Sequence, residues 1–262
     1  PRGGEMALEA MSSGAVDVMC KPGASYTVGD MTSELVSKVK AASRVDVQRL
    51  LQARPVESSP PALARALSRT TNQILAIGAS TGGTVAIEAI LRSMPPNAPG
   101  TVITQHMPEM FTRSFAERLD GLSSMEIREA EDGDSVVPGV ALIAPGDRHM
   151  LLRRSGARYF VNVKNGPMIN RQRPAVDVMF RSVARAAGRN VVGVILTGMG
   201  GDGAKGMLEM KEAGATNLAQ DEASCVVFGM PRVAIDMGGV DEILPLDRIT
   251  ERSLQLLNAH PA

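Results

Sequence analysis

A strand, a glycine-rich turn and a helix follow one another between residues 74 and 91, and this succession limits the fold more than any other feature of the chain. Residues 74–78 are a short apolar run with branched side chains, which predicts a buried strand. Residues 82–93 place apolar residues among good helix formers, which predicts a helix that Pro95 and Pro96 end. Such a succession is typical of α/β proteins.

The turn between this strand and helix suits several functions. Gly78-Ala79-Ser80-Thr81-Gly82 fits the G-x-S-x-G pattern, in which small neighbours let the chain turn sharply and leave the serine oxygen exposed above a sheet. The N–H groups that begin the helix would favour negative charge at the site. A similar turn holds phosphate in other α/β proteins, or serves only as a connection. The stretch alone leaves nucleophile, phosphate cradle and plain turn open.

Predicted strands and helices alternate from residue 73 onward. This alternation implies a doubly wound, mostly parallel sheet with helices on both faces, a Rossmann-like arrangement of three layers. A small antiparallel hairpin is expected around Ser155 and Gly156. The other predicted strands are 101–105, 125–130, 140–144, 191–196 and 216–219. The other predicted helices are 109–120, 174–187, one that ends near 213, and two in the remaining chain.

Composition narrows the classes of function. Hydrophobic residues make up 44% of the chain, but aromatic residues make up only 3% and Trp is absent, so 16 Met must help fill an aliphatic core. A formal net charge of zero argues against general binding to nucleic acid. Cys20 and Cys225 make no disulfide framework, which favours a reducing, cytoplasmic location. No apolar run reaches the ~18 residues of a membrane span, so membrane insertion is not expected.

The first 72 residues differ from the rest. Helices at 5–13 and 29–43 flank a short predicted strand at 15–19, and a single strand between two helices cannot close a core alone. We expect residues 1–43 to be the end of a doubly wound domain whose earlier strands lie before residue 1. The chain also lacks an initial Met, which agrees with this expectation. Residues 44–72 mix arginines with prolines and serines, which predicts a linker. Its arginines are either solvated or bind an acidic partner.

Ser80, His106 and Asp202 each follow a different predicted strand, at the edge of the sheet where α/β proteins bind ligands. A serine needs a base to attack at neutral pH, and imidazole serves because its ordinary pKa is about 6.5. A carboxylate then holds the imidazole in one tautomer. Asp202 could instead cap the helix that it precedes. His149, at the start of the hairpin, has a structural surface role or touches substrate, and His260 lies at a frayed end.

Four motifs occur in this order: Gly78–Gly83, Gln105–Pro108, Ala144–Asp147 and Leu196–Gly203. Together they resemble the catalytic domain of the chemotaxis response-regulator protein-glutamate methylesterases, over about residues 72–257. The resemblance implies that Ser80 is the nucleophile, His106 the base and Asp202 the orienting acid. It also implies an oxyanion donor in the backbone N–H of Met199, with Thr81 beside the nucleophile. The catalytic domain is then expected to cover residues 73–262.

The same resemblance implies a reaction and its partners. The expected activity is hydrolysis of glutamate γ-methyl esters on the cytoplasmic helices of methyl-accepting chemoreceptors, with deamidation of receptor glutamines, which resets chemotactic adaptation. No cofactor and no metal are expected. Two rivals remain: a nucleotide-binding oxidoreductase, although G-x-G-x-x-G is missing from the turn, and a non-catalytic adaptor.

Met11–Asp17 followed by Lys21 and Pro22 resembles the last third of a response-regulator receiver domain. In that family a lysine at this position contacts the phosphoryl group, so the resemblance gives this role to Lys21; alternatively, Lys21 is a surface lysine at a strand end. An intact receiver would also imply a partner, the histidine kinase of the chemotaxis system. The phosphoacceptor aspartate would precede Pro1, so this chain is not expected to be phosphorylated there.

Overall fold

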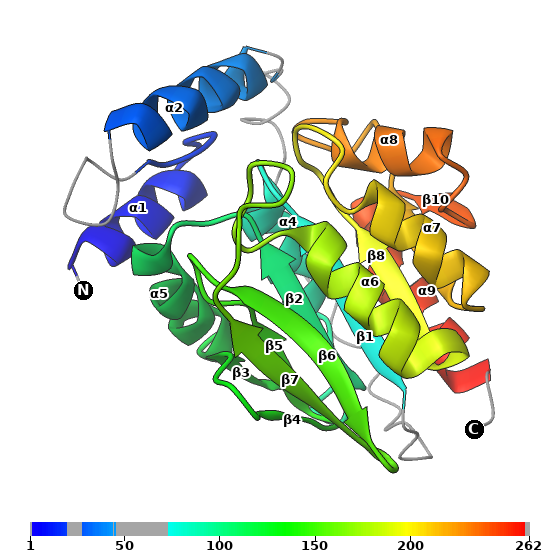
Figure 1. The fold of residues 1–262 in the computed structure, drawn as a ribbon. Coiled ribbons are helices and arrows are strands. Elements are labelled where there is room, and N and C mark those ends of the chain that lie inside the picture. The colour runs from blue at the N-terminus through cyan, green and yellow to red at the C-terminus, as the bar shows by residue number, and fades with distance from the viewer. Residues whose placement is uncertain (1, 20–27, 44, 46–72, 260–262) are drawn as a thin grey trace.

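The structure, a computed structural model, describes residues 2–19, 28–43, 45 and 73–259 (Figure 1). Residues 73–259 form a central parallel sheet with helices on both faces, and a smaller antiparallel sheet lies beside it. The predicted fold class is therefore confirmed. No helix in the described ranges is long and apolar enough to cross a bilayer.

The central sheet has seven strands, and every pair of neighbours runs parallel. In sheet order they are β10 (Glu242–Leu244), β9 (Thr216–Gln220), β8 (Val191–Ile195), β1 (Ile74–Ala79), β2 (Gly100–Gln105), β5 (Val140–Ile143) and β3 (Glu126–Glu129). The chain builds outward from β1 in one direction first and then, from β8, in the other. The connections after β1 and β8 therefore diverge, which is where such sheets bind ligands.

Strand β1 is buried along its whole length because both faces of the sheet are covered. Leu75 and Ile77 belong to one core, with α4 (Gly83–Arg92), α5 (Glu109–Asp120) and α9 (Leu246–Ala259). Ile74 and Ala76 belong to the other core, on the opposite face of the sheet. The helices of this second face are α6 (Val176–Ala187), α7 (Ala204–Glu212) and α8 (Met230–Asp236).

The second sheet is antiparallel and has the strand order β4 (Ser135–Val136), β7 (Arg158–Lys164) and β6 (His149–Ser155). The predicted hairpin is thus confirmed, with a third strand that the sequence did not indicate. The backbone N–H of Leu152 in β6 donates to the hydroxyl of Ser182 in α6, at 2.8 Å, so this sheet is fastened to the helix. A short 3₁₀ helix, Gly188–Asn190, then leads from α6 into β8.

The N-terminal segment contributes α1 (Arg2–Ser12) and α2 (Val28–Ala42), close to the two expected helices. Helix α1 packs closely on α5, since a Cβ on Gly4 would lie 2.7 Å from Oγ of Ser114. The prediction of a strand at 15–19 is wrong, because these residues join no sheet in the structure. A strand needs a neighbour to satisfy its backbone groups, and no described segment pairs with this one. Apart from residue 45, the expected linker lies outside the described ranges.

Candidate active site

The site begins with two residues that follow neighbouring strands. The parallel register of β1 and β2 ends with Ala79 opposite Gln105, so Ser80 and His106 come next on adjacent strands. The backbone N–H of His106 donates to the carbonyl of Ala79 at 3.1 Å, which continues the ladder past the last pair. The N–H of Ser80 donates to the carbonyl of Thr197 at 3.0 Å, beyond the end of β8. Three strand ends therefore meet at Ser80.

Close packing explains why small residues surround Ser80. Gly82 has a φ of 80°, in the left-handed region that favours glycine. A Cβ on Gly83 would lie 2.1 Å from Oε1 of Gln105, so α4 can start close to β2 only with glycine there. The amide of Gln105 donates to the carbonyl of Ser80 at 3.0 Å and to that of His106 at 3.2 Å. Gln105, for which sequence patterns indicate no role, thus fixes the backbones of both candidate residues.

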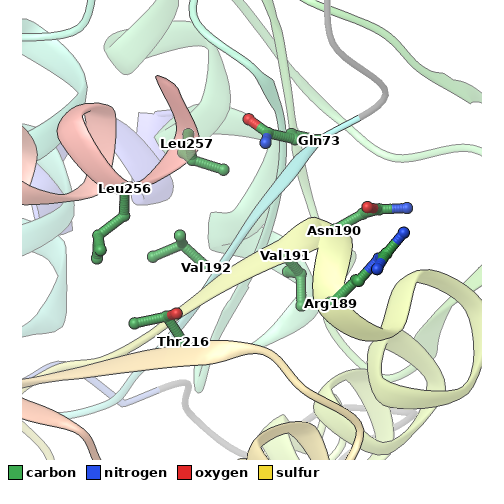
Figure 2. A pocket seen from close by; sticks show the side chains of 8 residues that line it. All are labelled: Gln73, Arg189, Asn190, Val191, Val192, Thr216, Leu256 and Leu257. Carbon is green, nitrogen blue, oxygen red and sulfur yellow. The ribbon is translucent and has the colours of Figure 1, made fainter. Parts of the chain in front are cut away.

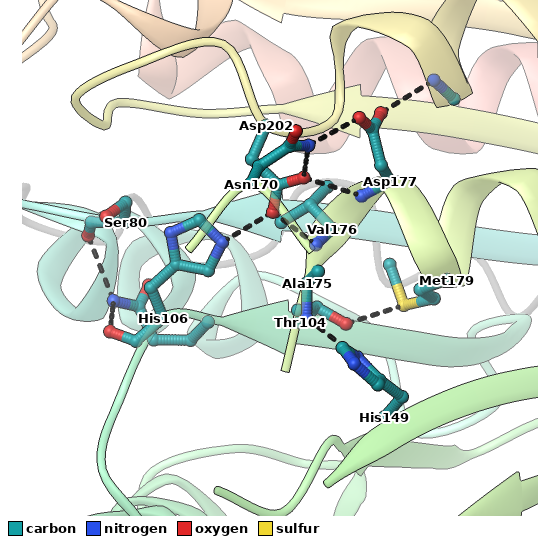
Figure 3. Close-up of polar contacts among 12 residues, drawn as sticks. Ser80, Thr104, His106, His149, Asn170, Ala175, Val176, Asp177, Met179 and Asp202 are labelled. Carbon is teal, nitrogen blue, oxygen red and sulfur yellow. Dashed lines mark hydrogen bonds and ion pairs between the residues drawn. The ribbon is translucent and has the colours of Figure 1, made fainter. Parts of the chain in front are cut away.

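His106 and Asp202 form a buried pair. Nε2 of His106 donates to Oδ2 of Asp202 at 2.8 Å, and the two side chains are 6% and 3% exposed. The other ring nitrogen, Nδ1, is buried and has no hydrogen-bond partner within the described ranges. Figure 3 shows this Nδ1 edge on the side of the ring that faces Ser80. The donated proton occupies Nε2, so the nitrogen that faces the serine is free to accept one.

The carboxylate of Asp202 accepts four hydrogen bonds (Figure 3). Besides His106, the donors are Nδ2 of Asn170 at 2.8 Å and the backbone N–H groups of Val176 at 2.7 Å and Asp177 at 3.2 Å. Burial alone raises the pKa of Asp202. The hydrogen bond and charge of His106, with the other donors, outweigh burial and bring this pKa below its ordinary value. Asp202 is therefore a charged acceptor at neutral pH.

The alternative role considered for Asp202, a cap on the helix that it precedes, does not match the structure. The N-cap residue of α7 is Gly203, which has no side chain to cap the helix. Asp202 instead accepts the N–H groups of Val176 and Asp177, which begin α6. This helix N-terminus places partial positive charge beside the carboxylate.

Asn170 and Asp177 are parts of the site that the sequence did not reveal. Asp177 is 3% exposed, and its Oδ1 accepts the N–H of Gly206 in the first turn of α7 at 2.8 Å. Its Oδ2 accepts from Nδ2 of Asn170 at 2.8 Å. Burial raises the pKa of Asp177, and the charge of Asp202 adds to that rise against the hydrogen bonds it accepts. The pKa of Asp177 is therefore raised whereas that of Asp202 is lowered, although both carboxylates accept from Asn170.

The turn that contains Met199 lies against Ser80. A Cβ on Gly198 would lie 2.7 Å from Cβ of Ser80 and 2.3 Å from Sδ of Met230, so only glycine fits between them. The carbonyl of Gly198 accepts the N–H groups of Gly229 and Met230, which fixes the turn. Within the described part of the chain, the backbone N–H groups of Met199 and Thr81 have no hydrogen-bond partner.

Thr81 also contacts the N-terminal segment. Its hydroxyl donates to Oδ2 of Asp17 at 3.0 Å, and Asp17 forms an ion pair with Lys38 of α2 at 2.6 Å. The segment that precedes residue 73 therefore reaches the residue next to Ser80. Lys21 lies outside the described residues.

His149 takes no part in this cluster. His149 was expected at the surface but is 5% exposed. Its Nε2 donates to the carbonyl of Pro167 at 2.9 Å, and its Nδ1 accepts the N–H of Ala175 at 3.3 Å, so the residue has a structural role in the interior. His260 lies outside the described residues.

A small pocket lies at the other end of the sheet (Figure 2). Its lining includes Gln73, Val191 and Thr216, which stand at the amino ends of β1, β8 and β9. Ser80 and His106 follow the carboxyl ends of their strands, so this pocket and the candidate site do not overlap. No group of His, Cys, Asp and Glu in the described ranges is arranged to hold a metal ion.

An α/β fold that brings a serine, a histidine and a buried aspartate to one edge of its sheet has the layout of a serine hydrolase. Comparison with known proteins identifies the family within this class. The family model described as CheB methylesterase matches residues 75–253, so the chain belongs to the CheB methylesterase family and is an enzyme.

Similar proteins agree with this assignment. The chain is 63% identical to protein-glutamate methylesterase/protein-glutamine glutaminase 4 of Anaeromyxobacter dehalogenans, over 98% of this chain and 71% of that protein. It is 53% identical to protein-glutamate methylesterase/protein-glutamine glutaminase 2 of Syntrophus aciditrophicus, over 98% and 75%. The crystal structure of the Thermotoga maritima CheB methylesterase catalytic domain superposes with a TM-score of 0.69 at 42% identity. The superposed region covers 71% of this chain and 99% of the chain in the crystal structure.

Proposed function

We propose that this chain hydrolyses glutamate γ-methyl esters, and deamidates glutamines, on the cytoplasmic helices of chemoreceptors, and so resets chemotactic adaptation. The names of its relatives support both reactions. The observation that carries the proposal is the buried pair of His106 and Asp202, whose free Nδ1 lies toward Ser80. This arrangement favours a serine mechanism. We expect the reaction to take place in the cytoplasm and to need no cofactor or metal.

The first step is attack by Ser80. Asp202 is ionised and accepts the proton on Nε2, which keeps the imidazole of His106 in the tautomer with a lone pair on Nδ1. Nδ1 takes the hydroxyl proton while Oγ of Ser80 forms a bond to the ester carbonyl carbon. The imidazolium that results is stabilised by the carboxylate. Nδ1 is the base because Nε2 is already committed to Asp202.

The carbonyl oxygen becomes negative in this step. The unpartnered N–H groups of Thr81 and Met199, on two turns that touch at Ser80, are suited to receive it. In serine hydrolases the loss of one such donor costs about 2.7–4 kcal/mol of transition-state stabilisation.

The intermediate then collapses. The imidazolium of His106 gives its proton to the leaving oxygen, and methanol departs from an acyl ester on Ser80; from a glutamine, ammonia departs instead. A water molecule, deprotonated by Nδ1, attacks the acyl carbon in the second half of the reaction. Glutamate leaves, and Ser80 recovers its proton.

The proposal extends to domain organisation. Residues 1–43 are the C-terminal remnant of a receiver domain, 44–72 a linker and 73–262 the catalytic domain. In the intact receiver Lys21 contacts the phosphoryl group, which the histidine kinase of the chemotaxis system supplies. The hydrogen bond between Asp17 and Thr81 supports contact between the two domains.

Methanol release from receptor membranes that carry labelled methyl groups tests the function. Ser80→Ala and His106→Ala should each abolish nearly all release, while Ser93→Ala, at an exposed helix end, should not. A fluorophosphonate should label the chain, and Ser80→Ala should prevent the label. Normal release by either active-site variant would refute the mechanism. No release by the wild-type chain, with Ser80 still labelled, would refute the substrate but keep the serine chemistry.

A further inference from the structure

Two buried acids exchange helix caps beside the candidate site. Asp202, just before α7, accepts the N–H groups that begin α6, whereas Asp177, at the start of α6, accepts the N–H of Gly206 in the first turn of α7. Asp177 and Asp202 are called the acid pair below. Both are at least 96% buried, so their charges are poorly shielded by water.

Asn170 joins the acid pair. Its Nδ2 lies 2.8 Å from Oδ2 of Asp177 and 2.8 Å from Oδ1 of Asp202 (Figure 3). An amide nitrogen carries two hydrogens, so it can give one to each carboxylate. The oxygen of Asp202 that Asn170 contacts is the one that does not bind His106. Asn170 therefore holds the carboxylate from the side opposite the imidazole.

The backbone at Asn170 suits this role. Asn170 and Arg171 have φ of 53° and 64°, and Ile169 and Gln172 exchange backbone hydrogen bonds around them. This is a two-residue turn with both central residues left-handed, and such turns favour Asn and Gly. The amide is thus presented by a short, closed loop.

We infer that Asn170 is a positioning residue of the reaction: by bridging the acid pair, it aims the Asp202 carboxylate at His106 and so sets the nucleophilicity of Ser80. The inference rests on the proposed function. The amide is chemically specific here because it is neutral and donates twice. A carboxylate at the same place would add a third negative charge and donate nothing while ionised.

Two substitutions separate the amide from the turn that carries it. Asn170→Gly removes the amide in a backbone conformation that glycine adopts freely. Asn170→Asp keeps the shape but replaces the donor. Arg171→Gly is the matched control, because Arg171 is exposed and occupies the other left-handed position of the same turn. All three are made in the full chain.

The readout is the second-order rate at which a fluorophosphonate labels Ser80, since this reports the nucleophile without a receptor. Asn170→Gly should lower the rate roughly 10- to 100-fold, the value of one hydrogen bond to a charged group. Arg171→Gly should stay within about twofold of the wild type. Thermal unfolding of each variant shows whether the fold is kept.

The pH profile supplies a second readout that lost stability would not move. The carboxyl group introduced by Asn170→Asp would face Asp177 from α6 and Asp202 from the loop before α7, and the other oxygen of Asp202 binds His106 at the end of β2. The two native carboxylates favour protonation of the new group, and once protonated it donates one hydrogen bond again. The labelling rate of Asn170→Asp relative to Asn170→Gly should therefore rise as the pH falls from about 8 to about 5.5.

The outcomes are distinct. If Ser80→Ala is labelled as fast as the wild type, the proposed serine mechanism itself is refuted. Labelling that requires Ser80 but is equally fast in Asn170→Gly and Arg171→Gly would overturn only the role of Asn170. A constant ratio between the Asp and Gly variants across the pH range would overturn it as well. A large loss in Asn170→Gly with a ratio that rises toward acid pH supports it.

Discussion

Replacing Asp202 with Asn would test how the site fixes its histidine. Each oxygen of Asp202 accepts one backbone N–H and one side-chain donor: Oδ2 serves Val176 and His106, and Oδ1 serves Asp177 and Asn170. An amide keeps one oxygen, so its NH₂ must face one of these two pairs of donors. The consequence for catalysis depends on which pair it faces.

The structure indicates that the new NH₂ group would face His106 and Val176. If the new NH₂ in Asp202→Asn faced Asn170, that residue would have to turn its amide and lose its bond to the carboxylate of Asp177. On the other side, His106 needs only to exchange tautomers and accept at Nε2. Its proton then moves to Nδ1, the nitrogen that accepts from Ser80 in the proposed mechanism. A comparable wrong tautomer in serine proteases lowers kcat about 10⁴-fold, which is about 5.4 kcal/mol.

Asp202→Asn should lower the free energy of unfolding by less than it raises the activation barrier of the reaction. The N–H of Val176 would face the new NH₂ and remain unsatisfied, which costs about 1–3 kcal/mol of stability. Methanol release and urea unfolding measure the two effects, and ¹⁵N NMR of the His106 ring reports the tautomer directly. Asp134→Asn is the control, because Asp134 also has a lowered pKa but pairs with Arg128 away from the site. Activity within tenfold of the wild type, or a retained Nε2–H proton, would refute this reasoning.

Two further substitutions follow from packing and burial. Gly78→Ala should cost about 1–3 kcal/mol of stability in urea unfolding and lower kcat, because its Cβ would lie 2.3 Å from Cγ1 of Val176, whose N–H donates to the carboxylate of Asp202. Gly121→Ala, where the nearest contact of the new Cβ is 3.7 Å, should change neither the stability nor kcat. Equal effects of the two substitutions would contradict the packing argument. Burial raises the pKa of the Cys225 thiol to about 12. In a Cys20→Ser background, iodoacetamide at pH 8 should therefore alkylate Cys225 about a thousandfold more slowly than an ordinary thiol, with a rate that rises about tenfold per pH unit; a rate near that of a free thiol would refute the shift.

Local patterns were sufficient to predict the frame of the site. The apolar runs at β1 and β8 predict buried parallel strands, and the glycines after them predict tight turns, because both signals arise within a few neighbouring residues. Once the strands are known to be parallel, their carboxyl ends lie at one edge. Ser80 and His106 are adjacent for this reason, through the register of β1 with β2.

Short or unpartnered strands could not be predicted in the same way. β4 has two residues and β10 has three, too few to show a period, and each exists because a neighbouring strand accepts it. Residues 15–19 show the opposite case: they have the composition of a strand, but no described strand pairs with them. Strand formation depends on a partner that the segment itself does not encode.

The surroundings of Asp202 were hidden for a related reason. An aspartate before a helix predicts a cap on that helix, because capping is normally local. Here the starts of α6 and α7 lie close enough for each helix to be capped by the acid at the start of the other. The partners are more than twenty residues apart in the chain, so the exchange follows from helix packing alone.

This exchange joins stability to catalysis. The bonds that cap α6 are the same bonds that orient the Asp202 carboxylate, and the bond that caps α7 holds Asp177 within reach of Asn170. A shift of α6 against α7 by about 1 Å would weaken these bonds together, since hydrogen bonds lengthen out of range over that distance. His106 would then lose its fixed tautomer while both hydrophobic cores stayed packed. Substitutions at the contact between α6 and α7 should therefore lower turnover before they unfold the chain.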